Sequence, residues 1–194
     1  MAKLIGKNRI KTAVFISGNG SNLKSLIFFS KKKISPIQIS LVISNNKRAR
    51  GLNYAKKYKI NKFSIIYKNK KNADFLILKK LKKNNIKLIL LAGFMKILSK
   101  NFIISFKHPI LNIHPSLLPK YKGLNTHERV IKNNEKFTGC TVHMVNKKLD
   151  SGKIILRKKI KIYKKDDAKT LEKRVLKQEH KLYPKAIGKF LSNL

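Results

Sequence analysis

Apolar runs and helical stretches alternate along most of the chain. Mainly apolar runs predict strands, and the nearly continuous run "IKLILLAG" predicts a strand buried on both faces. The predicted strands lie at residues 11–17, 37–44, 61–67, 86–93, 109–115, 137–145 and 154–163. Apolar side chains at helical spacing, such as Leu23, Leu26 and Ile27, predict helices. The predicted helices lie at residues 21–29, 48–58, 72–85, 126–136 and 166–191.

This alternation is typical of βαβ units and predicts an α/β fold. We expect a single domain over residues 1–194, with a mostly parallel twisted sheet and helices on both faces. Asn72 is the expected N-cap of its helix, and an aspartate caps the last helix. Pro184 is expected to interrupt that last helix.

The charge balance raises the question of a polyanionic partner. The formal net charge is +39, from 47 Lys and Arg against 8 Asp and Glu. Clustered basic residues are the signature of nucleic-acid binding. Here they are spread evenly, with 15 in residues 1–65, 14 in 66–130 and 18 in 131–194. Lys, Ile and Asn share A/T-rich codons, so nucleotide bias explains the charge as well as function does, and we expect no specific nucleic-acid partner.

Cysteine content and hydropathy bear on the compartment. The single cysteine, Cys140, cannot form an intrachain disulfide, which favours a reducing, cytoplasmic setting. No apolar run approaches the roughly 20 residues that span a bilayer, so no membrane association is expected. The N-terminus lacks the pattern of a signal peptide and is expected to be unprocessed.

Two segments at predicted strand ends have the composition of ligand sites. The first, "SGNGSN" at residues 17–22, follows a strand and opens a helix, where backbone amides bind anions. It matches neither GxGxxG nor a Walker loop, and an ordinary turn explains it equally well. The second, "LAGFMKIL" at 91–98, either packs into the core or lines a pocket for a flat aromatic ligand.

Asn112 and His114 are the strongest candidates for chemistry. They lie two residues apart near a predicted strand end, so both side chains project to the same side. An amide donor beside an imidazole can stabilise an oxyanion and move a proton. Asp150, in a loop between two strands, would stabilise the protonated imidazole if it lay beside His114. Each residue also has a purely structural interpretation, as a hydrogen-bonded histidine or a turn-forming aspartate.

Two other kinds of site find little support. The five histidines show no HxxxH spacing, and one cysteine offers no zinc ligand set, so no metal is expected. The GxSxG motif of serine hydrolases is absent from the sequence.

Five blocks together give the chain a family resemblance. They are "FISGNGSNLKSLI", "LAGFMKILS", "LNIHPSLLPKYKGLNTH", "TVHMVNKKLDSGKIIL" and "VLKQEHKLYP". In this order the chain resembles the phosphoribosylglycinamide formyltransferases, folate-dependent enzymes of purine synthesis with a Rossmann-like fold. The resemblance implies formyl transfer from 10-formyltetrahydrofolate, as cosubstrate, to the amine of glycinamide ribonucleotide, without a metal. It further implies a phosphate-binding half at about 12–100, a catalytic and folate-site half at about 101–194, and a monomer or weak homodimer.

The resemblance also assigns roles to individual residues. Asn112 and His114 would stabilise the tetrahedral intermediate, His114 would donate the proton, and Asp150 would assist it. Thr141 would help to hold a water molecule. The ribonucleotide and its phosphate would contact Gly20, Ser21, Asn22 and Glu179. The folate would contact Met95, Lys96, Ile97, Leu98, Asn112 and Lys70.

Some positions depart from the family pattern, and some alternatives stay open. Lys122 replaces a proline and Asn125 a histidine in a turn beside the site, and Lys96 replaces an arginine. Leu176 stands where a glutamine is often found. The alternatives are a related formyl-folate enzyme, either a deformylase or a tRNA formyltransferase, and a nucleic-acid-binding α/β protein. The related enzymes are expected to carry an additional domain, which fits this length less well.

Overall fold

Strands and helices alternate through residues 9–193, the part of the chain that the computed structural model describes. Two compact units divide between Leu111 and Asn112. The first contains β1 (Ile10–Ile16), α1 (Ser21–Ser30), β2 (Ile37–Ser44), α2 (Leu52–Lys57), β3 (Asn61–Ser64), α3 (Lys70–Lys83), β4 (Leu88–Leu91) and α4 (Lys100–Phe106). β5 (Ile110–His114) crosses the division, and α5 (Thr126–Lys132), β6 (Phe137–Met144), β7 (Ile154–Lys161) and α6 (Ala168–Leu191) follow. The expectation of an unprocessed N-terminus concerns residues 1–8, which lie outside the described residues.

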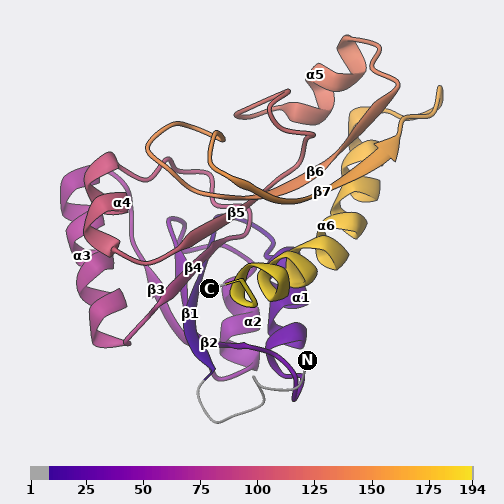
Figure 1. Ribbon diagram of the computed structural model, residues 1–194. Coiled ribbons are helices and arrows are strands. Elements are labelled where there is room, and N and C mark those ends of the chain that lie inside the picture. The colour runs from indigo at the N-terminus through magenta and orange to yellow at the C-terminus, as the bar shows by residue number, and fades with distance from the viewer. Residues whose placement is uncertain (1–8, 194) are drawn as a thin grey trace. The chain divides into compact units, whose positions relative to one another are not determined.

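Parallel strands form the centre of the first unit. β1 pairs in parallel with β2 and with β4, and β3 pairs in parallel with β2. Because a parallel connection has to cross over the sheet, a helix follows each of these strands. Figure 1 shows α1 and α2 on one side of the strands and α3 and α4 on the other. Residues 13–16 of β1 are 0% exposed, as expected of a strand covered on both faces.

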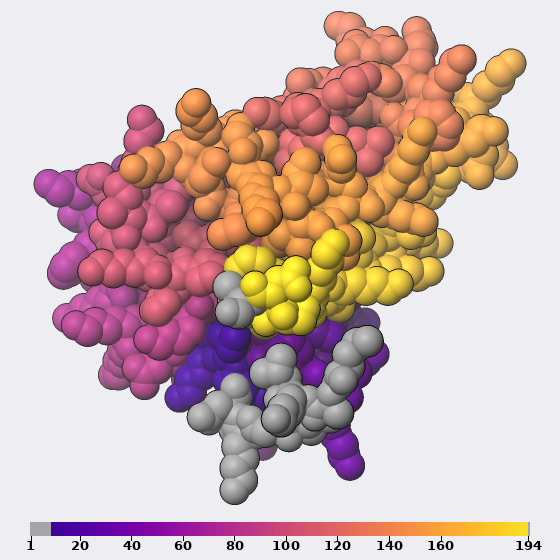
Figure 2. Space-filling view, in the orientation of Figure 1, coloured from indigo at the N-terminus to yellow at the C-terminus, as the bar shows by residue number. Residues whose placement is uncertain are grey.

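The second unit is built around an antiparallel pair. β6 and β7 run antiparallel and are joined by residues 145–153. Helix α6 packs against both strands and against α5, through a stripe of buried side chains that includes Leu171, Val175 and Leu182. Three successive exposed residues, 157–159, lie on β7, and Figure 2 shows the orange segments of this unit at the surface.

The predicted interruption at Pro184 is wrong, because α6 continues through it to Leu191. A proline inside a helix removes one backbone hydrogen bond and crowds the preceding turn. The neighbouring Tyr183, Ala186 and Ile187 are all 0% exposed. The burial of these side chains offsets the lost bond, so the helix persists where the local pattern predicts a break.

Two further local predictions need correction. The N-cap of α3 is Asn69 and not Asn72, because the Asn69 side chain accepts a 3.1 Å hydrogen bond from the Asn72 backbone N–H. Helix α4 was not predicted at all. It is short and begins at a cap in which the Ser99 hydroxyl accepts a 2.9 Å hydrogen bond from the Phe102 N–H. Such a helix depends on one cap and two buried aromatic residues rather than on a long apolar repeat.

The seven strands follow the order β3-β2-β1-β4-β5-β6-β7, with the antiparallel pair at one end. The predicted α/β fold with a mostly parallel sheet is therefore confirmed. None of the helices in the described residues is long and apolar enough to cross a membrane.

Candidate active site

The end of β5 carries Asn112 and His114 in the second unit. The alternation of the strand directs both side chains to one side, and its neighbours Leu111 and Ile113 are buried. His114 is only 5% exposed. A buried imidazole needs polar partners, and an oxygen atom lies beside each of its two nitrogens.

Asp150 lies beside one nitrogen of this imidazole. Its Oδ2 is 3.4 Å from Nδ1 of His114, and both side chains are less than a tenth exposed. The same Oδ2 accepts a 2.9 Å hydrogen bond from the backbone N–H of Gly123. Asp150 has a φ of 45°, so the loop between β6 and β7 adopts a left-handed turn at the residue that faces His114.

The other nitrogen of His114 faces the backbone of Tyr121. Nε2 of the imidazole donates a 2.8 Å hydrogen bond to the Tyr121 carbonyl oxygen. Tyr121, Gly123 and Asn125 all have positive φ angles, so this segment is a series of tight turns. Its backbone therefore holds both members of the pair, since its Tyr121 carbonyl faces His114 and its Gly123 N–H faces Asp150.

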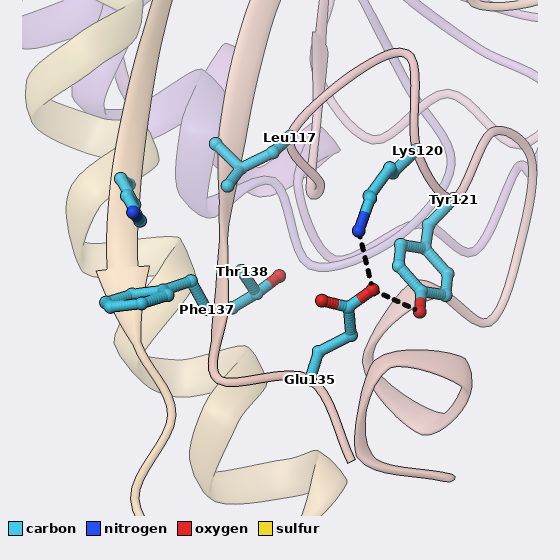
Figure 3. A pocket seen from close by; sticks show the side chains of 7 residues that line it. Leu117, Lys120, Tyr121, Glu135, Phe137 and Thr138 are labelled. Atoms are coloured by element: carbon cyan, nitrogen blue, oxygen red, sulfur yellow. Dashed lines mark hydrogen bonds and ion pairs between the residues drawn. The ribbon is translucent and has the colours of Figure 1, made fainter. Parts of the chain in front are cut away.

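The side chain of Tyr121 is anchored separately. Its hydroxyl donates a 3.0 Å hydrogen bond to Oε1 of Glu135, which also accepts a 2.9 Å bond from Lys120 Nζ. Hydrogen bonds from Lys120 and then from Tyr121 lower the pKa of Glu135. Figure 3 shows these three side chains at one side of a cavity of about 230 Å³, with Leu117, Phe137 and Thr138 opposite.

His143 belongs to the same cluster, although it was not among the site residues predicted from the sequence. This residue of β6 is 2% exposed, and its Nε2 lies 3.1 Å from Nδ2 of Asn112 and 3.6 Å from Oδ1 of Asp150. Burial, and then the neighbouring His114, lower the pKa of His143, while the Met144 carbonyl and Asp150 oppose that shift. The available signal was the period of two that places His143 on the same face of its strand as Thr141.

Thr141 supports the turn that follows β5. Its hydroxyl donates a 2.6 Å hydrogen bond to the Ser116 carbonyl and accepts a 3.1 Å bond from the Leu118 N–H. The side chain is completely buried, at 0% exposure. In this structure the hydroxyl is therefore hydrogen-bonded to the backbone of Ser116 and Leu118. The water-binding role that the resemblance implies stays a prediction.

The two residues that depart from the family pattern in the turn beside the site, Lys122 and Asn125, each have a specific structural role. Nζ of Lys122 donates a 2.6 Å hydrogen bond to the Ser151 hydroxyl, next to Asp150. Asn125 caps α5 in the left-handed conformation, which asparagine tolerates better than most residues. The Lys122 contact ties the turn to the loop of Asp150.

Glu179 is 6% exposed on α6 and lies close enough to Cys140 to affect its thiol. Burial raises the pKa of Cys140 to about 12, and the charge of Glu179 adds to this rise. A carboxylate so deeply buried is uncommon unless it is hydrogen-bonded or functional.

The loop with Gly20, Ser21 and Asn22 lies in the first unit, between β1 and α1. Gly20 has a φ of 72°, and a Cβ there would meet the Cα of Gly51 at 2.6 Å. This close approach requires glycine on both sides, and Gly51 was not among the site residues predicted from the sequence. The first turn of α1 has no acidic residue and no side-chain cap, as suits an anion site at a helix N-terminus.

The predicted folate segment also lies in the first unit, after β4. Met95 and Ile97 are 58% and 62% exposed, and Lys96 is exposed too. Leu98, at 6% exposed, belongs to the core. The Ser17 hydroxyl accepts a 2.7 Å hydrogen bond from the Met95 N–H, which ties this segment to the end of β1. Lys70 is exposed at the start of α3.

Within residues 9–193, no group of three His, Cys, Asp or Glu side chains has the arrangement of a metal site. The Asp150–His114 pair, the Asn112 amide and the second imidazole are instead suited to proton transfer and to the stabilisation of an oxyanion.

Comparison with known proteins identifies the class. Residues 10–187 match the model of the formyl transferase family, and the chain belongs to this family. Among its relatives is the phosphoribosylglycinamide formyltransferase of Haemophilus influenzae, which is 43% identical over 183 residues, covering 93% of this chain and 86% of that protein. The family resemblance found in the sequence is thereby confirmed.

Other relatives include much longer proteins. The human trifunctional purine biosynthetic protein adenosine-3 is 41% identical over 184 residues, which are 93% of this chain but 18% of that protein. A solved structure of phosphoribosylglycinamide formyltransferase from Anaplasma phagocytophilum has a TM-score of 0.88 at 41% identity, covering 93% of this chain and 85% of that one. The same enzyme from Bacillus halodurans gives 0.90 at 32% identity, with 94% and 95% covered.

Proposed function

We propose that this chain transfers the formyl group of 10-formyltetrahydrofolate to the amine of glycinamide ribonucleotide, in the synthesis of purines. The observation that carries the proposal is the cluster of His114, Asp150 and Asn112, with the first two side chains buried, in a member of the formyl transferase family. The relative from Haemophilus influenzae, which bears the name of this activity, aligns with almost the whole chain.

The proposed reaction is nucleophilic addition followed by elimination. The amine nitrogen of the ribonucleotide attacks the formyl carbon, the carbonyl bond opens, and negative charge develops on the formyl oxygen. Asn112 and His114 stabilise that oxygen by donating hydrogen bonds. The carbon–nitrogen bond to N10 of the folate then breaks, the carbonyl re-forms, and the amine proton passes to N10. All charge and proton tasks fall to side chains, and no metal is assigned a step.

Within this scheme His114 acts through Nε2. Nδ1 faces the carboxylate of Asp150, so Nε2 is the nitrogen that can face substrate. Its present acceptor is the Tyr121 carbonyl at 2.8 Å, which the substrate oxygen would replace. Asp150 keeps the ring oriented and favours its charged form while the intermediate exists.

The remaining assignments follow the nature of each segment. We propose that the amides of Gly20, Ser21 and Asn22 bind the phosphate, and that Glu179 contacts the ribonucleotide. The folate is assigned to a segment with exposed apolar side chains, and Asn112 serves both folate binding and catalysis. The folate ligands in this scheme are Met95, Lys96, Ile97, Leu98, Asn112 and Lys70. Thr141 supports the site, and we expect a cytoplasmic monomer or weak homodimer.

The test is an assay of the purified protein with 10-formyltetrahydrofolate, with and without glycinamide ribonucleotide. We expect formylated product that depends on both substrates. Release of formate without the ribonucleotide would favour the deformylase alternative. Tight, steeply salt-dependent binding of DNA by a protein without formyl transfer would favour the nucleic-acid alternative. The His114→Ala variant, which removes the proposed donor, is expected to lose at least about 10²-fold in kcat.

A further inference from the structure

The imidazole of His143 contacts the proposed oxyanion donor directly. Its Nδ1 lies 2.9 Å from the Met144 carbonyl oxygen, and its Nε2 lies 3.1 Å from Nδ2 of Asn112. The ring is 2% exposed, so both contacts are shielded from solvent. A buried ring with two close polar neighbours has little freedom in where it carries its proton.

These two contacts determine the tautomer. A carbonyl oxygen only accepts, so Nδ1 must carry the hydrogen that it donates to Met144. The other nitrogen then has a lone pair, which needs a donor, and the NH2 group of Asn112 is the donor at 3.1 Å. If the amide were turned by 180°, its oxygen would face that lone pair, and both groups would lose a hydrogen bond.

We propose that neutral His143, as its Nδ1–H tautomer, is a positioning residue that holds the Asn112 amide with its NH2 group directed for catalysis. One hydrogen of the NH2 group goes to His143, and the second is left for the developing oxyanion. His143 touches no reacting atom in this scheme and acts only through Asn112. The inference rests on the proposed function, because the oxyanion belongs to that reaction.

The charged form of His143 would reverse this arrangement. A protonated ring carries hydrogen on both nitrogens, so Nε2 would need an acceptor and Asn112 would turn to present its oxygen. The titratable groups that face the ring are Asp150, whose Oδ1 is 3.6 Å away, and His114. Burial and His114 lower the pKa of His143 and outweigh Asp150 and the Met144 carbonyl, so the neutral ring dominates at pH 7.

Two substitutions separate positioning from packing. His143→Gln can still present an acceptor, its Oε1, to Asn112, whereas His143→Leu fills much of the space without one. We expect His143→Leu to lower kcat by at least about tenfold with little change in either KM, because a misdirected oxyanion donor affects only the transition state. His143→Gln should recover most of that loss. The control is His108→Leu, the same change at a histidine that lies near Lys87 in the first unit.

The pH dependence of kcat is a readout that packing alone would not change. In the wild type, kcat should fall on the acid side as His143 takes up a proton. In His143→Gln this fall should begin at lower pH, because glutamine does not titrate. Equal kcat for the Leu variant and the wild type, or an acid limb unaltered in the Gln variant, would overturn the proposal.

The wild-type protein supplies a test that needs neither activity nor a variant. Long-range ¹H–¹⁵N NMR spectra at pH 7 distinguish the two neutral tautomers of histidine from each other and from the charged ring. We expect the Nδ1–H tautomer for His143. Finding the Nε2–H tautomer or a protonated ring would refute the positioning role even if formyl transfer is confirmed. Failure of formyl transfer by the wild type would count against the proposed function and leave the tautomer result to decide this inference.

Discussion

At the scale of single residues, one carboxylate lies beside two imidazoles. Oδ2 of Asp150 faces His114 and accepts from Gly123, while Oδ1 lies nearest to His143. The chain has only eight acidic residues against 47 basic ones, so a buried aspartate beside two histidines is a rare local source of negative charge. Its charge and its shape are separable, because asparagine has nearly the same size.

The first prediction concerns that charge. Asp150→Asn keeps an oxygen that can accept from the Gly123 N–H but no longer stabilises a charged His114. We expect kcat to fall by about 10²-fold or more, within the usual range for acid–base groups, and KM to change little. Steady-state kinetics with both substrates, together with a thermal melt of the variant, would measure this. A well-folded variant with kcat within twofold of the wild type would show that the charge is not used.

Cys140 gives a second prediction at this scale. Burial raises the pKa of its thiol to about 12, so almost no thiolate exists at neutral pH. We expect the folded protein to react with an aromatic disulfide reagent at least about 10²-fold more slowly than free cysteine does. In denaturant, the one cysteine of the chain should react completely. Rapid reaction of the native protein would contradict the burial of this side chain.

At the scale of elements, a close backbone approach sets the position of Asp150. A Cβ on Gly152 would lie 1.7 Å from the Met144 carbonyl oxygen, so only glycine lets the loop return this tightly toward β6. The Met144 N–H also donates a 2.9 Å hydrogen bond to the Lys153 carbonyl. The loop therefore closes on the end of β6, and Asp150 is held at its turn.

The third prediction tests this closure with a matched pair of glycines. Gly152→Ala should force the loop away from Met144, lowering kcat by more than about tenfold, because displacements of about 1 Å are costly in catalysis. Gly188→Ala places the same methyl group in α6, where nothing lies within 4 Å. That control should leave kcat unchanged and stabilise the helix by about 0.5–1 kcal/mol. Equal kinetics for the two variants would contradict the account of the loop.

Hydrophobic patterning predicted the element types well and their limits less well. Strand β2 (Ile37–Ser44) begins and ends as expected, because its apolar run is flanked by polar turns on both sides. Pro184 and α4 show what patterning omits. The first depends on tertiary burial that offsets a lost hydrogen bond, and the second on one serine cap. Neither effect has a period along the chain.

The candidate site was predictable where chemistry depends on adjacent positions in one strand. Asn112 and His114 follow from a period of two, but the pairing of Asp150 with His114 was expected only through the family resemblance. His143 was not singled out, because its role comes from the pairing of its strand with neighbours far away in the sequence. The Lys122 contact to Ser151 likewise depends on two loops meeting, which single-sequence patterns do not encode.

At the scale of the whole molecule, the positive charge and three buried or half-buried histidines act in the same direction on stability. The net charge of +39 already makes the compact state repel itself. Burial lowers the pKa of His127, His143 and His180 below the usual histidine value of 6.5. Protonation of these rings would add charge to a chain that is already strongly positive, and would do so where solvent is excluded at His143 and partly excluded at the other two.

The sign of the resulting pH dependence follows from where protons bind. Well above pH 6.5, these histidines are neutral in both the folded and the unfolded state, so their full contribution to stability is present. As the pH falls below that value, the unfolded chain takes up protons first, and the free energy of unfolding decreases until the folded histidines titrate as well. Glu135 and Asp167 have lowered pKa values, so their ionised carboxylates also stabilise the folded state. That contribution is lost only at still lower pH.

The last prediction is therefore a loss of stability between about pH 7 and pH 5, within the titration range of histidine. Urea unfolding followed by circular dichroism should show a midpoint that falls steadily over this range. In His143→Gln the fall should be smaller, because one of the buried titrating rings is gone. His108→Gln is the control, since the His108 ring lies nearer the surface, beside Lys87, and its removal should change the slope less. A midpoint that stays constant or rises on acidification would indicate that these rings are charged in the folded protein. That outcome would contradict the neutral state assigned to His143.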